Sequence, residues 1–437
     1  KMYRSLATAL LLSAATYGAM AQSGTNSPYS QFGLGVLADQ SSSMNRGMNG
    51  VALGFHEGNQ INYLNPASYA SIDSLSFIFD AGIAGQITNY KEGNNKLNAN
   101  NANFEYIVGG FRAFKHFGVS FGLLPYTNIN YSYYTTHKIN DANNTVGTST
   151  YSGSGGLRQA FVGMGWEPVR GLAIGVNGSY LYGSYNRSLV SSYSNAYANT
   201  LTKQYSAEVR NYKVDFGAQY TAQLNKKDAM TLGVTYGLGH KIGGKPQLDI
   251  ISTNSQTSVS DTATYAGTAG NKLELEIPTT FGIGLMYNHN NQLKLGIDYN
   301  LQKWAKVSSP NFSATAGNTV SYEMGTGFYK NRQQLSVGAD FCPQQMSRSF
   351  GKRLHYRAGV SYASPYYYIN GQDGPRELSA SLGIGLPIVN SYNNRSVLNI
   401  SAQWVQRSAT DFITENSFRI NIGLTFNERW FAKWKVE

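Results

Sequence analysis

The sequence is poor in several features on which other folds depend. It has one cysteine in 437 residues, Cys342, which excludes an internal disulfide and which we expect to be a structural thiol. Beyond its first residues it has no apolar run of about 20 residues, which excludes transmembrane helices. Charged residues are only 14% of the chain, and the six histidines lack the spacing of metal sites. We therefore expect no metal and no other cofactor.

Alternation of apolar and polar residues is what the chain has instead. Clear examples are residues 230–236 (MTLGVTY), 293–299 (LKLGIDY) and 418–426 (FRINIGLTF). A strand places successive side chains on opposite faces, so each run has an apolar face and a polar face. The polar face is rich in Gly, Ser, Asn and Gln, and the apolar face ends in aromatic residues. This pattern is typical of a transmembrane antiparallel β-barrel in the outer membrane of a Gram-negative bacterium.

The alternating runs number about fourteen, an even number as single-chain bacterial barrels require. They lie near residues 74–90, 102–114, 117–134, 148–167, 171–188, 204–224, 228–241, 271–288, 292–307, 329–342, 353–369, 376–388, 395–410 and 416–430. Short connections follow even strands, although 343–352 and 389–395 are longer than this scheme expects. Long polar connections follow odd strands, at 90–102, 135–150, 189–204, 242–270 and 308–328. Short turns are expected on the periplasmic side and long loops outside.

Four segments are predicted along the chain. Residues 1–21 have a basic start, an apolar core and a small-x-small cleavage site, which predicts a secretory signal peptide. Residues 22–72 do not alternate but contain apolar islands, which predicts an N-terminal hatch (plug) inside the barrel; the alternative is a disordered periplasmic extension. Residues 73–431 form the barrel, and 432–437 a periplasmic tail.

Asn65, Pro66 and Ala67 stand just before the first strand. Pro66 fixes φ and Asn65 can hydrogen-bond locally, which predicts a rigid turn where hatch meets wall. With this motif and its strand count, the chain resembles the FadL/TodX family of outer-membrane channels for long-chain fatty acids and other hydrophobic compounds. The resemblance implies an N-terminal hatch that carries Asn-Pro-Ala and a fourteen-stranded barrel. The alternative is an ordinary turn before a strand.

Pro125 lies inside the third predicted strand, where proline cannot donate a ladder hydrogen bond. The wall should therefore kink there. The family resemblance implies that such a kink opens the wall sideways, so that Leu124, Pro125, Tyr126 and Ile129 line a lateral gate and ligand path. The alternative is a harmless bulge near the outer rim.

Two segments depart from the fatty-acid channel pattern, residues 27–35 and residues 430–437. Some proteins with FadL-like barrels are subunits of secretion or barrel-assembly machines. Trp430, Phe431 and Trp434 are therefore candidate partner contacts, with anchoring at the membrane interface as the alternative.

The sequence contains little that resembles a catalytic motif. Residues 118–122 match G-x-S-x-G but lie inside an alternating strand rather than at a strand–helix elbow, so we predict that the chain is not an enzyme. Charges that should face the lumen can form a pairing network that packs hatch against wall; a hydrolase is the disfavoured alternative. They are Asp80, Glu105, Lys213, Asp215, Lys294, Asp298, Asp340, Arg357 and Arg419.

Net charge and overall pattern set the expected partners. The formal charge of +11 comes from scattered residues without a basic–aromatic stripe, which predicts contact with anionic lipid or lipopolysaccharide and no binding of nucleic acid. The leading functional prediction is passive uptake of hydrophobic small molecules with lateral release. The alternative is an accessory subunit that binds other outer-membrane proteins. A hydrophilic porin is disfavoured because about 50 residues are available to fill the lumen.

Overall fold

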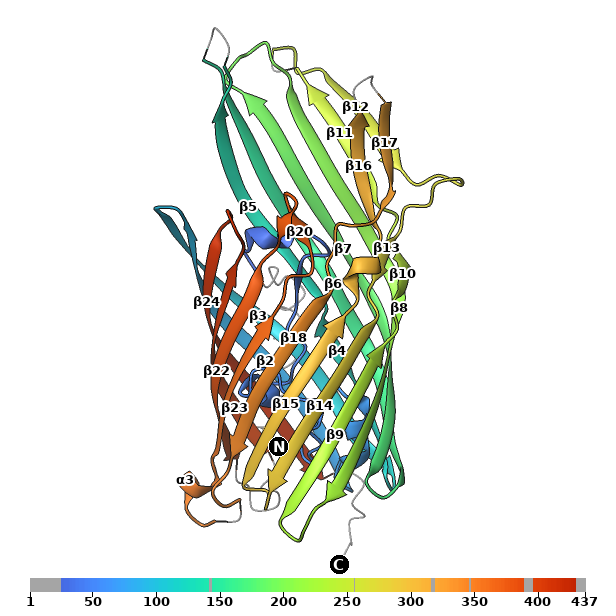
Figure 1. Cartoon of the computed structure of the whole chain (residues 1–437), viewed down its shortest axis with the longest axis vertical. Coiled ribbons are helices and arrows are strands. Elements are labelled where there is room, and N and C mark those ends of the chain that lie inside the picture. The colour runs from blue at the N-terminus through green and yellow to red at the C-terminus, as the bar shows by residue number, and fades with distance from the viewer. Residues whose placement is uncertain are drawn as a thin grey trace, which may run out of the picture.

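The computed structural model describes residues 25–140, 144–254, 256–315, 319–345, 347–388 and 396–429. In that part of the chain, fourteen antiparallel strands close into a barrel, which confirms the predicted fold class (Figure 1). The barrel closes where the first wall strand pairs with the last, from Ser76 opposite Arg429 to Lys91 opposite Thr414. No helix in these ranges is long and apolar enough to cross a membrane.

The wall follows the order of the sequence, and its third strand is built from two pieces, β4 and β5. The wall strands are β2 (Ser76–Glu92), β3 (Asn95–Phe114), β4 (Phe117–Pro125), β5 (Thr127–Lys138), β6 (Val146–Val169), β7 (Leu172–Tyr193), β8 (Thr200–Gln223), β9 (Asp228–Gly237), β14 (Thr280–His289), β15 (Leu293–Gln302), β18 (Arg332–Phe341), β19 (His355–Ala363), β22 (Arg376–Ile388), β23 (Ser396–Ser408) and β24 (Thr414–Arg429).

Burial along the strands follows the alternation of the sequence. On β2, Asp80 is fully buried on the lumen side, whereas Ile83 and Ile87 are 53% and 51% exposed on the outer face. The outer side chains are apolar because hydrocarbon surrounds them, and the inner ones are polar because they meet other protein groups. Asp80, Glu105, Lys294, Asp298, Asp340 and Arg357 are all buried on the lumen side, as the alternation predicts.

The strands differ greatly in length. β6, β7 and β8 have 24, 22 and 24 residues, against 10 in β9. The long strands continue past the rim at the long-loop end and form a sheet with the upper part of β5 and with β11 (Gln247–Thr253) and β12 (Ser260–Ala266) (Figure 1). We call this sheet the extension. A hairpin of β16 (Ser309–Thr315) and β17 (Thr319–Gly325) packs on it through a cluster that includes Leu248 and Tyr322.

The long loops predicted from the sequence are largely wrong. Most of the residues expected in long polar connections are strands, since β2 and β3 leave only a two-residue turn and β11, β12, β16 and β17 lie within 242–270 and 308–328. Both faces of these segments are largely solvated, so the apolar–polar alternation that reveals membrane strands is weak there. The remaining short elements are β10 (His240–Gly243), β13 (Leu275–Ile277), η3 (Trp304–Lys306), α3 (Phe350–Arg353), β20 (Tyr368–Ile369) and β21 (Gln372–Asp373).

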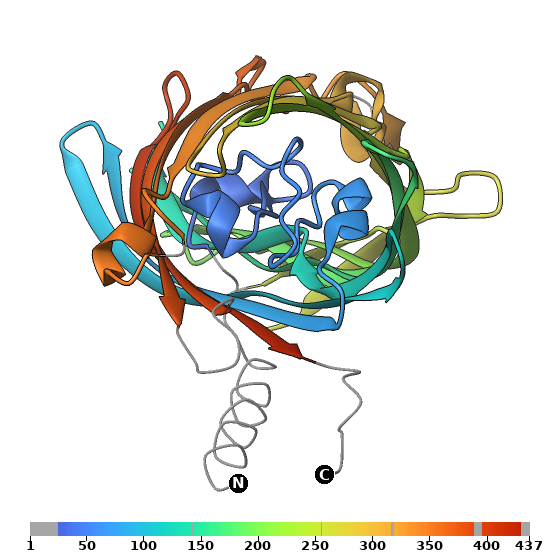
Figure 2. The ribbon, with the colours of Figure 1, turned by 90° about the horizontal axis from the view of Figure 1, so that it is seen from below.

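Residues 25–75, which we call the inner segment, lie inside the ring of strands (Figure 2). This segment has little regular structure, so its backbone polar groups are satisfied largely by turns, caps and the wall. Its elements are η1 (Pro28–Gln31), β1 (Val36–Leu37), α2 (Ser43–Arg46) and η2 (Pro66–Ser71).

Candidate functional site

The inner segment rests directly on glycines of the wall. At these positions an added Cβ would come closer than 3.0 Å to an atom of the inner segment. They include one glycine on each of ten different wall strands: Gly118, Gly165, Gly175, Gly217, Gly233, Gly296, Gly338, Gly359, Gly383 and Gly423. Because the wall carries no side chain at these positions, inner segment and wall pack as one core at close range.

Asn65, Pro66 and Ala67 lie where the inner segment meets β6, β7 and β8. Asn65 is fully buried and caps η2, since its Oδ1 accepts from the Ala67 N–H at 3.2 Å. Its Nδ2 donates to the Leu53 carbonyl at 2.9 Å and to the Ala218 carbonyl of β8 at 3.3 Å. Pro66 lies against Gly165 and Gly175. Asn65 thus uses one side chain to cap a helix and to tie it to the wall.

Buried ion pairs also hold the inner segment. Arg46 of α2 is 1% exposed, and its guanidinium lies 2.9 Å from the Glu105 carboxylate of β3 and 3.9 Å from that of Asp39. Burial alone would raise the pKa of Asp39, but Arg46 and hydrogen bonds from Ser41 outweigh it and lower that pKa. Removing one partner of such a pair leaves a buried charge uncompensated, which is strongly destabilising.

A second ionic group lies near the short-turn end. Lys294 of β15 pairs with Glu57 of the inner segment. Asp340 lies 3.3 Å from the Arg357 guanidinium and 3.0 Å from His355. The predicted charge network therefore links wall and inner segment, and its members reach across strands far apart in sequence.

Between the inner segment and the wall is a cavity of about 270 Å³. Its lining is more polar than apolar, and Arg407 pairs with Glu377 at 2.7 Å beside it. Arg332 and Arg419 line the same space. An apolar molecule placed there would take these charges away from water without replacing their hydration, which costs free energy.

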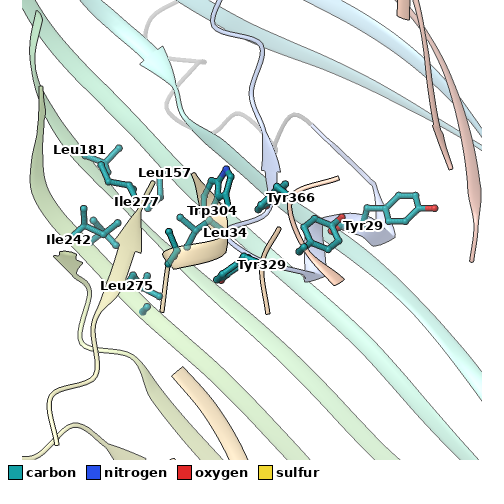
Figure 3. Packing of buried hydrophobic residues seen from close by; sticks show 14 of the residues in the cluster. Tyr29, Leu34, Leu157, Leu181, Ile242, Leu275, Ile277, Trp304, Tyr329 and Tyr366 are labelled. Atoms are coloured by element: carbon teal, nitrogen blue, oxygen red, sulfur yellow. The ribbon is translucent and has the colours of Figure 1, made fainter. Parts of the chain in front are cut away.

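Aromatic side chains pack together inside the barrel at the long-loop end, and Figure 3 shows Tyr29, Trp304, Tyr329 and Tyr366 among them. Phe32 of the inner segment stacks on Tyr367 at 5.5 Å between ring centroids, and Trp304 of η3 packs on Tyr366 at 4.7 Å. The Tyr366 hydroxyl donates to the carbonyl of Gly35. We call this cluster the aromatic cap: Tyr29, Phe32, Trp304, Tyr329, Tyr366, Tyr367 and Phe412.

The wall is interrupted at Pro125, where β4 ends. β4 pairs with β3 as far as Leu123 opposite Ile107, whereas β5 pairs with the inner-segment strand β1, with Leu37 opposite Thr127. The Pro125 carbonyl accepts a hydrogen bond from Gln40 at 3.1 Å. We call the stretch between β3 and β5 above this point the seam.

The other residues of the predicted gate lie beside the inner segment. Leu124 is 6% exposed and packs with Tyr63 in an apolar cluster. Ile129 is fully buried and faces Gly35. Tyr126 packs against the cluster that holds the aromatic cap and lines the cavity. The inner segment therefore occupies the inner side of the seam.

The G-x-S-x-G match has an ordinary role. Ser120 lies within β4, is fully buried, and donates its hydroxyl to the Gly109 carbonyl at 3.0 Å. Cys342 follows β18 and is 1% exposed, with its sulfur 3.6 Å from the carbonyl oxygen of Arg353. Trp430, Phe431 and Trp434 lie outside the described residues, as does the predicted signal peptide at 1–21.

Comparison with models of protein families identifies the family of the chain. The family model described as BamG matches residues 2–437. The chain belongs to the BamG family. No curated protein matches its sequence.

Solved structures similar to this BamG-family chain share its fold, the FadL/TodX type predicted from the sequence. A FadL homologue of Pseudomonas aeruginosa is 14% identical, with 90% of this chain and 99% of that chain covered and a TM-score of 0.61. The toluene transporter TbuX of Ralstonia pickettii is 12% identical, with 89% and 98% covered and a TM-score of 0.58. The CymD monoaromatic hydrocarbon channel is 15% identical, with 92% and 100% covered and a TM-score of 0.57.

Sequence reasoning missed three features of the site in this BamG-family member. The sequence gives a signal for the glycine contacts, since glycines recur on the polar face of the strands. It does not reveal which atoms of the inner segment they meet. The aromatic cap joins η1 to three distant loops, and no local pattern reveals such contacts. Strand β1 has only two residues, too few for periodicity to show.

Proposed function

We propose that this protein is an accessory, non-conducting barrel subunit of an outer-membrane protein complex. The observation that carries the proposal is the filled lumen. The inner segment contacts glycines on ten wall strands, buried ion pairs lock it in place, and the aromatic cap packs over it. A solute would have to displace all three to pass.

The chemistry of the cavity that remains in the lumen also supports an accessory, non-conducting function. A pathway for hydrophobic molecules needs a continuous apolar lining, with a few polar groups for orientation. The cavity here is lined by Arg332, Glu377, Arg407 and Arg419 among others, while the large apolar cluster is packed rather than hollow. Its tyrosines and Trp304 fill the place where an apolar ligand would enter.

The outer surface has features that suit contact with other proteins and with lipid. The extension rises well beyond the rim and presents long strands away from the membrane (Figure 1). Membership in a family named BamG, rather than one named for hydrocarbon transport, favours association with other outer-membrane proteins. The scattered positive charge would favour contact with anionic lipid or lipopolysaccharide around the barrel.

Native mass spectrometry of the protein, extracted gently from its own membrane, tests this function. We expect stoichiometric protein partners and no small hydrophobic ligand. A bound mass of a few hundred daltons that fatty acid displaces, with no protein partner, would overturn the proposal and favour a channel.

Uptake of hydrophobic compounds with lateral release is the second candidate, and the interruption at Pro125 favours it. The wall strand breaks there, and β3 and β5 do not pair above it. Of the structures with this fold, one is titled as a monoaromatic hydrocarbon channel and two as toluene transporters. For this function, part of the inner segment near Leu37 and Gln40 would have to move away from the seam, which a transport assay with a crosslink between inner segment and β5 would detect.

A further inference from the structure

The extension ends at one side in an unusual strand edge. β5 pairs with β6 from Ile129 to Lys138, and on its other side it pairs, in the described part of the chain, only with β1 at two residues. β3, its neighbour across the seam, pairs with β4 only from Ile107 onward. Along the seam, within the described residues, β5 therefore presents a free edge beyond Asn130 (Figure 1).

The direction of the backbone groups on this edge follows from one contact. The Asn130 N–H donates to the Ser30 hydroxyl at 3.2 Å, and that hydroxyl lies 3.3 Å from the Asn130 carbonyl oxygen. Both backbone groups of Asn130 thus point toward the seam and away from β6. In an antiparallel ladder the same side recurs at every second residue. The N–H and C=O groups of Ser132, Tyr134 and Thr136 therefore also point outward from the sheet.

These groups meet no partner within the described chain. The inner segment covers the edge as far as Asn130, whose backbone groups bond the Ser30 hydroxyl and whose side chain donates to Asn26, while the Tyr133 hydroxyl donates to Gln31. Beyond it, Ser132, Tyr134 and Thr136 are exposed, Tyr134 to 70%. Natural sheets usually protect such edges with charge, proline or bulges.

This edge lacks that protection. Residues 129–136 read INYSYYTT, without charge, proline or glycine, and are rich in residues that favour strands. A segment of this kind on an open edge is prone to pair with another chain. The opposite edge of the extension, β12, carries Asp261 and lies beside the β16–β17 hairpin. The unprotected edge is thus β5.

We infer that the β5 edge binds an extended segment of a partner protein, which adds a strand to the extension through backbone hydrogen bonds at Ser132, Tyr134 and Thr136. β1 shows the same mode within the chain, since Val36 and Leu37 already pair antiparallel with Asn128 and Thr127. The partner segment would continue where β1 and η1 stop. It would be uncharged and rich in residues that favour strands, because residues 129–136 of the edge with which it pairs carry no charge. This inference rests on the proposed function, since it states how the partner is held.

Hydrogen exchange resolved to single amides tests it, with the full chain alone and in the complex extracted from the membrane. In the complex, the amides of Ser132, Tyr134 and Thr136 should exchange at about one tenth of their rate in the isolated chain, or more slowly still. Those of Tyr133 and Thr135, which face β6, should be slow in both and serve as an internal control. Slow exchange at Ser132, Tyr134 and Thr136 in the isolated chain would overturn the inference, since the edge would already be covered.

A variant pair separates backbone from side chain. The double substitution Ser132→Pro and Tyr134→Pro removes two outward N–H groups and spares the bonds to β6, and it should lower the amount of co-purified partner about tenfold. The control, Ser132→Thr with Tyr134→Thr, keeps both N–H groups and should retain the partner.

The outcomes distinguish the two proposals. A partner that stays bound while the three amides exchange fast overturns this inference alone and leaves the accessory function standing. Pairing between two copies of this chain at β5 also overturns it. The absence of any stoichiometric protein partner overturns both.

Discussion

At the scale of single residues, glycine sets how closely the inner segment approaches the wall. The Leu53 carbonyl illustrates this, because it faces Gly233 of β9 and also accepts hydrogen bonds from Asn65 and Gln219, each at 2.9 Å. An oxygen held by two donors cannot move aside for a methyl group. The glycine on β9 is therefore required by its contact, not by its conformation.

We expect Gly233→Ala to destabilise the protein by roughly 1–3 kcal/mol, because the added Cβ would overlap the fixed carbonyl of Leu53. Chemical unfolding in detergent measures the change. Gly85→Ala on β2 is the matched control, since a Cβ there meets nothing within 4 Å. Equal unfolding midpoints for the two variants would contradict the close packing described for the lumen.

Asp39 gives the inner segment a dependence on pH. Its pKa is lowered from the usual 3.8, chiefly because Arg46 and Ser41 outweigh the effect of burial. A carboxyl with a folded pKa below its unfolded value stabilises the protein above the unfolded pKa, and this contribution disappears as pH falls through the folded value. Asp39 thus contributes at neutral pH and not in strong acid.

Asp39→Asn should lower stability by about 1 kcal/mol at pH 7, since it removes one of the two carboxylates that Arg46 faces and leaves Glu105 paired with it. The difference from the unmodified protein should shrink as pH falls below about 4, where the Asp39 carboxyl of the unfolded chain becomes protonated, and it should vanish below the lowered pKa of the folded state. Unfolding midpoints measured between pH 3 and 7 (roughly one unit apart) would test this. A difference that stays constant with pH would argue against the ion pair as its source.

At the scale of elements, the sequence predicts the membrane strands well and the other elements poorly. All fourteen wall strands are found near the predicted runs, because each must show hydrocarbon one face and protein the other. β11 and β12 were expected as loop, since neither strand faces hydrocarbon and no strict apolar–polar alternation is imposed. The lumen positions of Glu105 and Lys294 follow from strand parity, whereas their partners Arg46 and Glu57 depend on the fold of the inner segment.

Pro125 separates the two candidate functions at this scale. Because Tyr126 already donates to Leu157 and accepts from Ala38, we expect Pro125→Val to leave the barrel folded and its partners bound. Co-purification of partners and uptake of a labelled fatty acid are the two measurements. Pro387→Val on β22, a proline far from the seam, is the control. Loss of uptake in Pro125→Val alone would favour the channel over the accessory subunit.

At the scale of the whole molecule, the barrel and its contents behave as one body. Contacts on ten strands, ion pairs that reach from β3 to β15 and a cap that joins three loops all depend on the inner segment. A barrel of this circumference would enclose an aqueous channel if it were empty. The inner segment therefore decides whether the molecule conducts ions.

We expect the intact protein to conduct almost no ions in a planar bilayer, and a variant without residues 25–72 to conduct strongly if its wall folds. The deletion removes the side chains that fill the lumen but leaves β2 and every later wall strand in place. Heat-dependent mobility on gels would show whether the wall of the variant is folded, and Asp39→Asn serves as a variant that keeps the segment. Strong conductance of the intact protein would contradict a filled lumen. If the deletion variant is folded but does not conduct ions, the cap loops around Trp304 and Tyr366 close the barrel without the inner segment.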